Sequence, residues 1–275
     1  MPNINARNET FYYEKRGKGE ALFFISGMGG DHNDWKWQLP SHARYFSCYT
    51  FDPRGSGKSA AAAHGQTADT YTAELLADDL AAIMDVLGID KAHILGGSMG
   101  GVIAQAFALR HPERLLSLSL HSTFARVTGK MRAQFETELY LLGKLEVGDV
   151  LRSLAPLIWA ERTLTERRHI IEKFRSNRKT TGIAVDARVY ELQARLVLSV
   201  DYLAELGRIY VPVLVTTGQD DGLVPPEESR LIHNAIPGSR LKVFPGCGHA
   251  VTIENPQGFN TVSLRFLKAQ KGARS

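Results

Sequence analysis

One serine of the chain has the surroundings that nucleophilic catalysis requires. Ser98 lies in the run Gly-Gly-Ser-Met-Gly-Gly at residues 96–101, between an apolar, strand-like run at 92–95 and a helix-like run that begins at Val102. A serine hydroxyl is a poor nucleophile until a tight turn presents it to a base and to preformed hydrogen-bond donors. The flanking glycines would let the strand and helix approach closely around such a turn. Because the pattern alone has little specificity, its partners must lie elsewhere in the chain.

Two later segments supply an acid and a base. The apolar run 211–217 is followed by Gly-Gln-Asp-Asp-Gly-Leu-Val-Pro, which contains Asp220 and Asp221, and the run 240–244 is followed by Pro-Gly-Cys-Gly-His, which ends at His249. A histidine can take the serine proton and return it to a leaving group, while an acid fixes its tautomer. The residues therefore indicate nucleophilic catalysis by Ser98, with either aspartate as the acid.

The surrounding pattern predicts the elements that must position these groups. Continuous apolar runs indicate strands covered on both faces, and helical periodicity at 71–87, which Gly88 ends, indicates an amphipathic helix. The alternation of strands and helices predicts an α/β fold with a mainly parallel sheet. Strands are expected at residues 3–7, 10–15, 21–25, 45–51, 92–97, 115–121, 211–217 and 240–244, and helices at 71–87, 102–110, 227–235 and 256–268.

In parallel sheets, ligands bind beyond the carboxyl ends of the strands. The residues that follow four of the expected strands are a glycine-rich turn at 26–30 (Ser-Gly-Met-Gly-Gly), Ser98, the aspartate pair and His249. All four groups are therefore expected at one edge of one sheet. The backbone amides of the glycine-rich turn would there face a developing oxyanion.

A long segment between the sixth and seventh strands has helical signals and no strong strand signal. We expect residues 1–123 and 207–275 to form the core domain and residues 124–206 to form a helical cap, or lid, inserted after the sixth strand. The cap carries 14 Lys and Arg against 11 Asp and Glu, so it supplies +3 of the net charge of +4. Its expected helices span residues 131–145, 147–154, 165–178 and 186–203.

Composition narrows the classes of function. A chain of 275 residues with 44% hydrophobic and 23% charged residues is ordinary for a globular protein. Its basic stretch at 167–179 is interrupted by Glu172 and apolar residues, and no aromatic-interleaved basic motif favours nucleic-acid binding. No secretory leader or membrane-spanning run is evident, so a cytoplasmic protein is expected. Cys48 and Cys247 are expected to be free thiols, and the scattered histidines have no metal-ligand spacing.

Taken together, the motifs resemble those of the α/β-hydrolase superfamily over essentially the full length. The order serine, aspartate, histidine, the segment from Gly248 through Glu254-Asn255-Pro256 and the loop Asp-Pro-Arg-Gly-Ser-Gly-Lys-Ser at 52–59 all match that family. The resemblance implies an α/β-hydrolase fold and places the acid at Asp221. It also implies an oxyanion hole made by the amides of Met28 and Met99. Many relatives have histidine where this chain has Ser26, a change that should affect only the support of the loop.

The resemblance also suggests a substrate class. Residues 96–118 look like those of carboxylesterases and enol-lactone hydrolases, so hydrolysis of a carboxylic ester or lactone through an acyl-enzyme is expected, without metal or organic cofactor. Residues 244–266 are similar to hydrolases that cleave carbon–carbon bonds in ring-fission products, but those enzymes usually carry tryptophan where this chain has Ala250. Carbon–carbon cleavage is therefore the second hypothesis. Ser98 argues directly against relatives that use an aspartate nucleophile.

Two alternative functions belong to other classes. Residues 55–59 resemble the end of a phosphate-binding loop, but the glycine required five residues before Gly57 is Asp52, and Gly65 cuts short the helix that should follow. Arg54 is instead expected to brace its loop through Asp52 or a neighbouring carbonyl. A non-catalytic ligand receptor on the same fold is the other alternative, because fold does not fix function.

Substrate contacts are expected from the loop that follows the third strand and from the cap. Arginines of the cap are hypothesised to recognise a carboxylate on a small-molecule substrate or on an acidic carrier protein. Trp159, with its apolar neighbours, would line an acyl pocket. The candidate contacts are His32, Trp35, Trp159, Arg126, Arg188 and Arg195.

Overall fold

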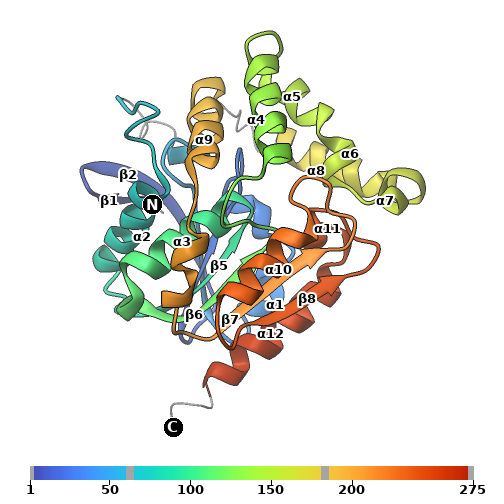
Figure 1. Cartoon of the computed structure of the whole chain (residues 1–275). Helices are drawn as coiled ribbons and strands as arrows, with labels where there is room; N and C mark the ends of the chain where they lie inside the picture. The colour runs from blue at the N-terminus through green and yellow to red at the C-terminus, as the bar shows by residue number, and fades with distance from the viewer. Residues whose placement is uncertain (1–2, 60–64, 181–185, 272–275) are drawn as a thin grey trace.

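The computed structural model, which describes residues 3–59, 65–180 and 186–271, is built around one eight-stranded sheet (Figure 1). The strand order is β1-β2-β4-β3-β5-β6-β7-β8; β1, β2 and β4 pair antiparallel, and the remaining pairs are parallel. The predicted α/β class and mainly parallel sheet are confirmed. The strands are β1 (Asn3–Ala6), β2 (Glu9–Arg16), β3 (Ala21–Ile25), β4 (Ser47–Phe51), β5 (Ala92–Gly97), β6 (Leu115–His121), β7 (Val213–Gly218) and β8 (Arg240–Phe244).

Helices cover both faces of the sheet, and two apolar clusters fill the space between. Along β3, Phe23 and Ile25 join one cluster while Leu22 and Phe24 join the other, as the two-residue period of a strand requires. The first cluster includes residues of α2 (Ala73–Val86), α3 (Met99–Arg110) and α10 (Pro226–Ala235), and the second includes residues of α1 (Leu39–His42) and α12 (Pro256–Lys271). Shorter elements are η1 (His32–Trp35), η3 (Pro112–Arg114), η4 (Leu203–Arg208) and α11 (Val251–Glu254).

The segment between β6 and β7 is helical, and its helices lie above the sheet in Figure 1. We call residues 124–206 the helical insertion. An isolated bridge between Arg126 and Asp201 ties its two ends together. A single helix expected at 165–178 is instead two helices that meet at Arg167. The insertion contains α4 (Gly129–Leu142), α5 (Val147–Ser153), α6 (Ala155–Ile158), α7 (Glu161–Glu166), α8 (Arg168–Thr180) and α9 (Ala187–Ser199).

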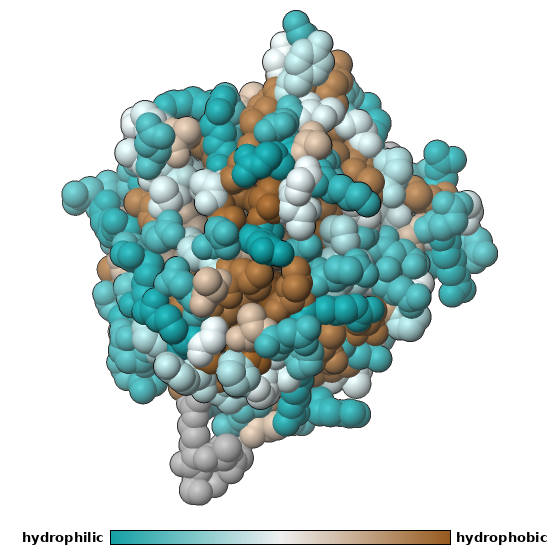
Figure 2. All heavy atoms as spheres, viewed as in Figure 1, coloured by the Kyte–Doolittle hydropathy of each residue, from teal (hydrophilic) through white to brown (hydrophobic). Residues whose placement is uncertain are grey.

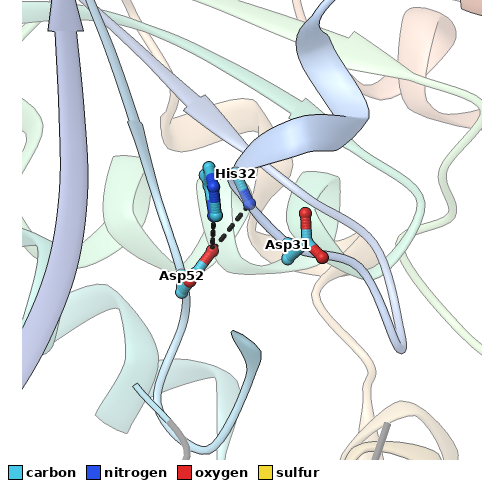
Figure 3. Close-up of side chains that lie close together, drawn as sticks. All are labelled: Asp31, His32 and Asp52. Carbon is cyan, nitrogen blue, oxygen red and sulfur yellow. Dashed lines mark hydrogen bonds and ion pairs between the residues drawn. The ribbon is translucent and has the colours of Figure 1, made fainter. Parts of the chain in front are cut away.

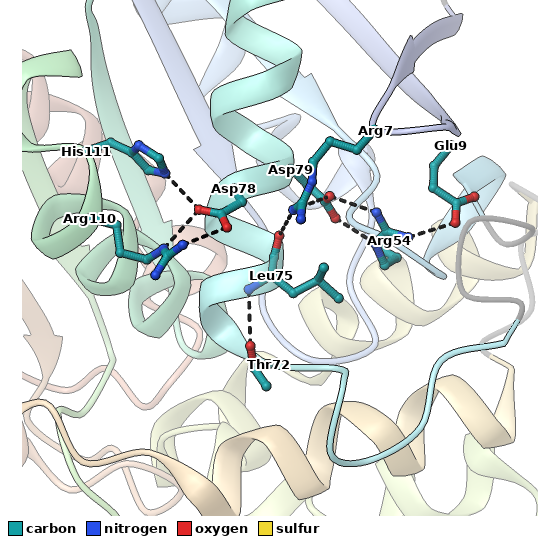
Figure 4. Close-up of polar contacts among 9 residues, drawn as sticks. All are labelled: Arg7, Glu9, Arg54, Thr72, Leu75, Asp78, Asp79, Arg110 and His111. Atoms are coloured by element: carbon teal, nitrogen blue, oxygen red, sulfur yellow. Dashed lines mark hydrogen bonds and ion pairs between the residues drawn. The ribbon is translucent and has the colours of Figure 1, made fainter.

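The loop after β4 is held by an ion-pair network that differs from the expected one. Arg54 makes a two-pronged contact with Asp79 of α2, at 2.7 and 2.8 Å, and a third bond with Glu9 at 2.8 Å, whereas the expected partner was Asp52 or a neighbouring carbonyl (Figure 4). The planar guanidinium matches the two oxygens of a carboxylate, and Arg54 and Asp79 are both buried. This loop is therefore fixed to α2, which leaves Asp52 free for contacts on its other side.

Within the described residues, no helix is both long enough and apolar enough to cross a membrane. The polarity of the surface is uneven on the face drawn in Figure 2, where hydrophobic residues show through in the middle, below the end of α4, and hydrophilic residues cover most of the outline.

Candidate active site

The turn at Ser98 has a strained backbone conformation. β5 ends at Gly97 and α3 begins at Met99, so Ser98 alone makes the turn, with φ +54° and ψ −124°. A non-glycine residue at such angles costs about 1–3 kcal/mol and persists only when its surroundings impose it. Here the Ser98 amide donates to the His121 carbonyl at 2.9 Å, and the Thr123 hydroxyl donates to the Ser98 carbonyl at 2.7 Å. The end of β6 therefore helps to impose the turn on β5.

Close backbone contacts explain the two glycines that flank the turn. A Cβ on Gly96 would lie 2.2 Å from the Gly100 carbonyl oxygen, and a Cβ on Gly100 would lie 2.2 Å from the carbonyl oxygen of Ile25 in β3. These distances are far inside van der Waals contact. The strand–turn–helix unit thus reaches its geometry only because both positions lack a side chain.

The histidine and one of the two candidate aspartates are in direct contact. His249 Nδ1 lies 2.9 Å from Asp221 Oδ2, and the amides of Leu223 and Val224 donate to the other oxygen of Asp221 at 3.1 and 2.8 Å. The Asp221 side chain is fully buried, whereas Asp220 is exposed. With Nδ1 held by Asp221, Nε2 is the histidine nitrogen left for chemistry.

Ser98 and His249 line the same cavity, whose volume is about 910 Å³. The parallel strands bring these residues to one edge of the sheet. Gly97, next to Ser98, pairs with His121 at the end of β6, and the loops that follow β7 and β8 carry Asp221 and His249. Most of the lining is apolar and comes from both the sheet edge and the helical insertion. The candidate nucleophile and base therefore face a largely apolar chamber.

The amides of Met28 and Met99 are available as a pair of donors. Among the interactions of the described chain, neither amide donates to another protein group. Their loops adjoin, since a Cβ on Gly27 would lie 3.1 Å from Ser98 Cβ. Ser26 supports the loop from below, because its hydroxyl donates to the Asp31 carbonyl at 2.8 Å. That contact shows what the serine does at the position where many relatives have histidine.

Gln193 connects the helical insertion to the loop that carries Met28. This fully buried residue of α9 accepts from the Gly29 amide at 2.8 Å and donates to the Ser56 hydroxyl at 3.0 Å. It thus joins three segments: α9, the loop after β3 and the loop after β4. Sequence reasoning missed Gln193, because a polar residue on an amphipathic helix carries no sign of its distant partner.

The other side of the insertion is fixed to the loops of the acid and the histidine. The Leu157 carbonyl accepts from the Gly222 amide at 3.0 Å, and the Ile158 carbonyl accepts from the His249 amide at 2.7 Å. Buried Glu254 adds a further link, as it accepts from the Gly248 amide at 2.8 Å and from the Thr163 hydroxyl. The segment around α6 and α7 is therefore part of the scaffold that holds His249.

His32 lies beneath the site rather than in it. It is buried, is not among the described residues that line the cavity, and its amide and Nδ1 each lie 2.7 Å from Asp52 Oδ1 (Figure 3). The Lys58 amide donates to the other Asp52 oxygen at 2.8 Å. Burial alone would lower the pKa of His32, but the bond to Asp52 and the nearby carboxylates outweigh it and leave the pKa raised. The pair therefore holds two loops together.

Asp31, His32 and Asp52 also offer three possible metal-ligand atoms within 4.8 Å of one another. These atoms already serve the protein: Asp31 accepts from the Asn33 amide at 2.7 Å, and Asp52 binds both His32 and Lys58. The three side chains are therefore better explained as hydrogen-bonding groups that hold the loops together than as ligands of a cation.

The remaining expected substrate contacts divide into two groups. Trp35 and Trp159 line the cavity. The three arginines proposed to bind a carboxylate are not among the described residues that line the cavity, and each is exposed. Arg188 donates to the Gln66 carbonyl at 2.7 Å, Arg195 pairs with Glu191 at 2.8 Å, and Arg126 lies at the bridge with Asp201.

Two other titratable groups near the site are held neutral. Burial, together with the neighbouring charge of His249, lowers the pKa of His121 to about 3. Burial likewise raises the pKa of the free thiol of Cys247 to about 11. Neither group therefore competes with Ser98 or His249 near neutral pH.

A serine on a strained turn at the end of a central parallel strand, with a histidine–aspartate pair at the same edge of the sheet, is the arrangement of an α/β hydrolase. Residues 20–256 match the model of the α/β hydrolase fold family, and the chain belongs to that family.

Individual relatives agree with this assignment. A protein of Caulobacter sp. (strain K31) named "Putative carbamate hydrolase RutD" is 30% identical over 91% of both chains. A thermophilic esterase from Thermogutta terrifontis has a TM-score of 0.83 at 26% identity over 98% of both chains. The enol-lactonase from Burkholderia xenovorans LB400 has a TM-score of 0.87 at 23% identity over 97% of this chain and 100% of its own, a likeness of fold.

The close contact at Gly100 predicts a large effect of one methyl group. Gly100→Ala should lower the free energy of unfolding by about 3 kcal/mol, because Ile25 or the turn must move to accept the new Cβ. The matched control is Gly129→Ala at the start of α4, where nothing lies within 4 Å. The control should be neutral or more stable by up to about 1 kcal/mol. Urea unfolding of both variants checks this, and equal stabilities would contradict it.

Proposed function

We propose that the protein hydrolyses a carboxylic ester or lactone through an acyl-enzyme formed on Ser98. The observation that carries the proposal is the 2.9 Å contact between His249 and buried Asp221 at the edge of the cavity that Ser98 also lines. The strained turn supports it, since strain of this kind is concentrated at functional sites.

In the first half of the reaction, the Ser98 hydroxyl oxygen attacks the carbonyl carbon of the ester. His249 takes the hydroxyl proton on Nε2, and Asp221 stabilises the imidazolium through Nδ1. The tetrahedral oxyanion accepts from the amides of Met28 and Met99, and each such donor contributes about 3 kcal/mol in the transition state. The carbon–oxygen bond then breaks, and His249 gives its proton to the departing alkoxide.

The second half repeats these steps with water as the nucleophile. His249 takes a proton from water as the hydroxide oxygen attacks the acyl carbon, and it returns the proton to Ser98 when the acid leaves. For a lactone, the alcohol released in the first half remains attached to the acyl group. The same residues serve both halves, so no further catalytic group is required.

The substrate class is proposed from the chamber and from the relatives. A largely apolar lining suits an acyl or alkyl group, with the insertion as the cap that selects it. The likeness to the esterase supports esters. Lactones are included because a lactone is a cyclic ester whose carbonyl is attacked in the same way. The name of the Caulobacter relative adds carbamates to the compounds worth testing, since their carbonyl is attacked in the same way.

Carbon–carbon bond hydrolysis is the second candidate. A structure of this type, a meta-cleavage product hydrolase from Pseudomonas fluorescens IP01, is 21% identical with a TM-score of 0.82, a likeness of fold. Ala250 lines the cavity at the position where such enzymes usually carry tryptophan. Ester hydrolysis therefore ranks first, and a non-catalytic receptor ranks last, because a receptor has no use for the contact between His249 and Asp221.

Replacement of the nucleophile should abolish turnover. Ser98→Ala should lower kcat/KM for a chromogenic ester by at least about 10⁴-fold, because no acyl-enzyme forms, while thermal unfolding stays cooperative. A panel of esters, lactones, carbamates and ring-fission dienones identifies the substrate class in the same assay. Residual activity of Ser98→Ala near that of the unmodified protein would exclude the proposed role. Turnover of the dienones alone would favour the second candidate.

Gln193 should act on the rate through the loop that carries Met28. Gln193→Ala removes the acceptor of the Gly29 amide and should lower kcat about tenfold, with a smaller change in KM, because removing one partner of a buried hydrogen bond costs about 1–3 kcal/mol. Arg195→Ala, an exposed change on the same helix, is the control and should leave kcat unchanged. If kcat falls more than KM rises, the substitution has loosened the loop that carries Met28. If KM rises while kcat stays unchanged, only a substrate contact has been lost, and the prediction is contradicted.

A further inference from the structure

A buried acid lies in the wall of the cavity that the insertion provides. Glu138 of α4 lines the cavity and is only 1% exposed. Other residues of the lining include Phe135, Val147 and Leu151, which carry no charge. A carboxyl group in such surroundings is costly unless it is paired or performs a function.

Glu138 is held by hydrogen bonds and not by an ion pair. The Gln134 side-chain amide donates to Oε1 at 3.0 Å, and the Tyr190 hydroxyl of α9 donates to Oε2 at 2.8 Å. Tyr190 is itself fully buried and lines the same cavity. No cationic side chain of the described residues pairs with Glu138. Burial raises the pKa of Glu138, although the bonds from Gln134 and Tyr190 oppose this effect.

The acid keeps the capacity to bind a further group. A carboxylate has about four acceptor positions on its two oxygens, and the protein fills one on each. Because Glu138 and Tyr190 come from two different helices of the insertion, their geometry is fixed by packing. A donor on a ligand in the cavity would therefore meet an oriented acceptor.

The other charged residues of the lining do not provide a site for a carboxylate either. Its remaining charged lining residues are Asp34, Glu146 and Arg152. Arg152 has a side chain that is 61% exposed and already pairs with Asp149 at 2.5 Å. The chamber thus disfavours a carboxylate and favours a donor or a cation, which is opposite to the preference expected from the arginines of the insertion.

We propose that Glu138 and Tyr190 form a specificity subsite that binds an amine or hydroxyl group of the substrate, away from the carbonyl that Ser98 attacks. The subsite rests on the proposed ester or lactone hydrolysis and narrows it to substrates with a polar, donor-bearing end. A substrate that ends in a carboxylate is selected against at the same place.

The test compares phenyl esters of straight-chain acids that end in methyl, hydroxyl, ammonium or carboxylate, together with acetate esters of alcohols that carry the same end groups. The unmodified protein should show a kcat/KM at least tenfold higher for the ammonium than for the carboxylate ester, in the acyl or the alcohol series. Glu138→Gln keeps the shape and removes the charge, so this ratio should fall about tenfold. Glu136→Gln, on the exposed face of the same helix, should leave the ratio unchanged.

Tyr190→Phe provides an independent variant, because it removes only the hydroxyl that orients Glu138. The ratio should fall at least threefold, and this variant decides the matter if Glu138→Gln does not fold. Normal turnover of the methyl-ended esters with an unchanged ratio in the folded variants would overturn the subsite while leaving ester hydrolysis intact. Failure of every ester, in a protein whose Ser98 does not react, would instead contradict the proposed function.

Discussion

The close approach of three backbone segments around Ser98 is the constraint on which the rest of the structure depends. Gly96 touches Gly100 and Gly100 touches Ile25, so β3, β5 and α3 meet without side chains between them. Only then does Ser98 adopt its strained angles and lie beside the amides of Met28 and Met99. The parallel sheet that allows this approach also brings the loops of Asp221 and His249 to the same edge.

The helical insertion is joined to this edge on two sides. Gln193 holds the loop of Met28, while Leu157, Ile158 and Glu254 hold the loops of the acid and the histidine. The parts of the insertion that carry these contacts therefore belong to the scaffold that holds these loops. Glu138 on α4 and Tyr190 on α9 line the chamber and are hydrogen bonded to each other.

Sequence patterns predict the sheet well, and they indicate the candidate chemical groups, because both depend on local signals. Apolar runs mark the strands, and the residues that follow them are Ser98, Asp221 and His249. Contacts between distant segments leave no local signal. Arg54 was expected to bind Asp52 or a neighbouring carbonyl, and its partners include the more distant Asp79. The three arginines of the insertion, hypothesised to bind a carboxylate of a substrate or of a carrier protein, lie outside the lining of the cavity. Gln193 and Glu138 were missed for the same reason, since polar residues on amphipathic helices are usually exposed.

The proposed function requires that Ser98 is the nucleophile of an acyl-transfer reaction. Incubation with a fluorophosphonate, followed by intact-mass measurement and peptide sequencing by mass spectrometry, tests it most directly. We expect one covalent adduct per chain, on Ser98, with labelling that slows when Asp221 is replaced by Asn, because His249 then loses the partner that fixes its tautomer. An unlabelled protein that is folded, or an adduct on another residue, would contradict the claim.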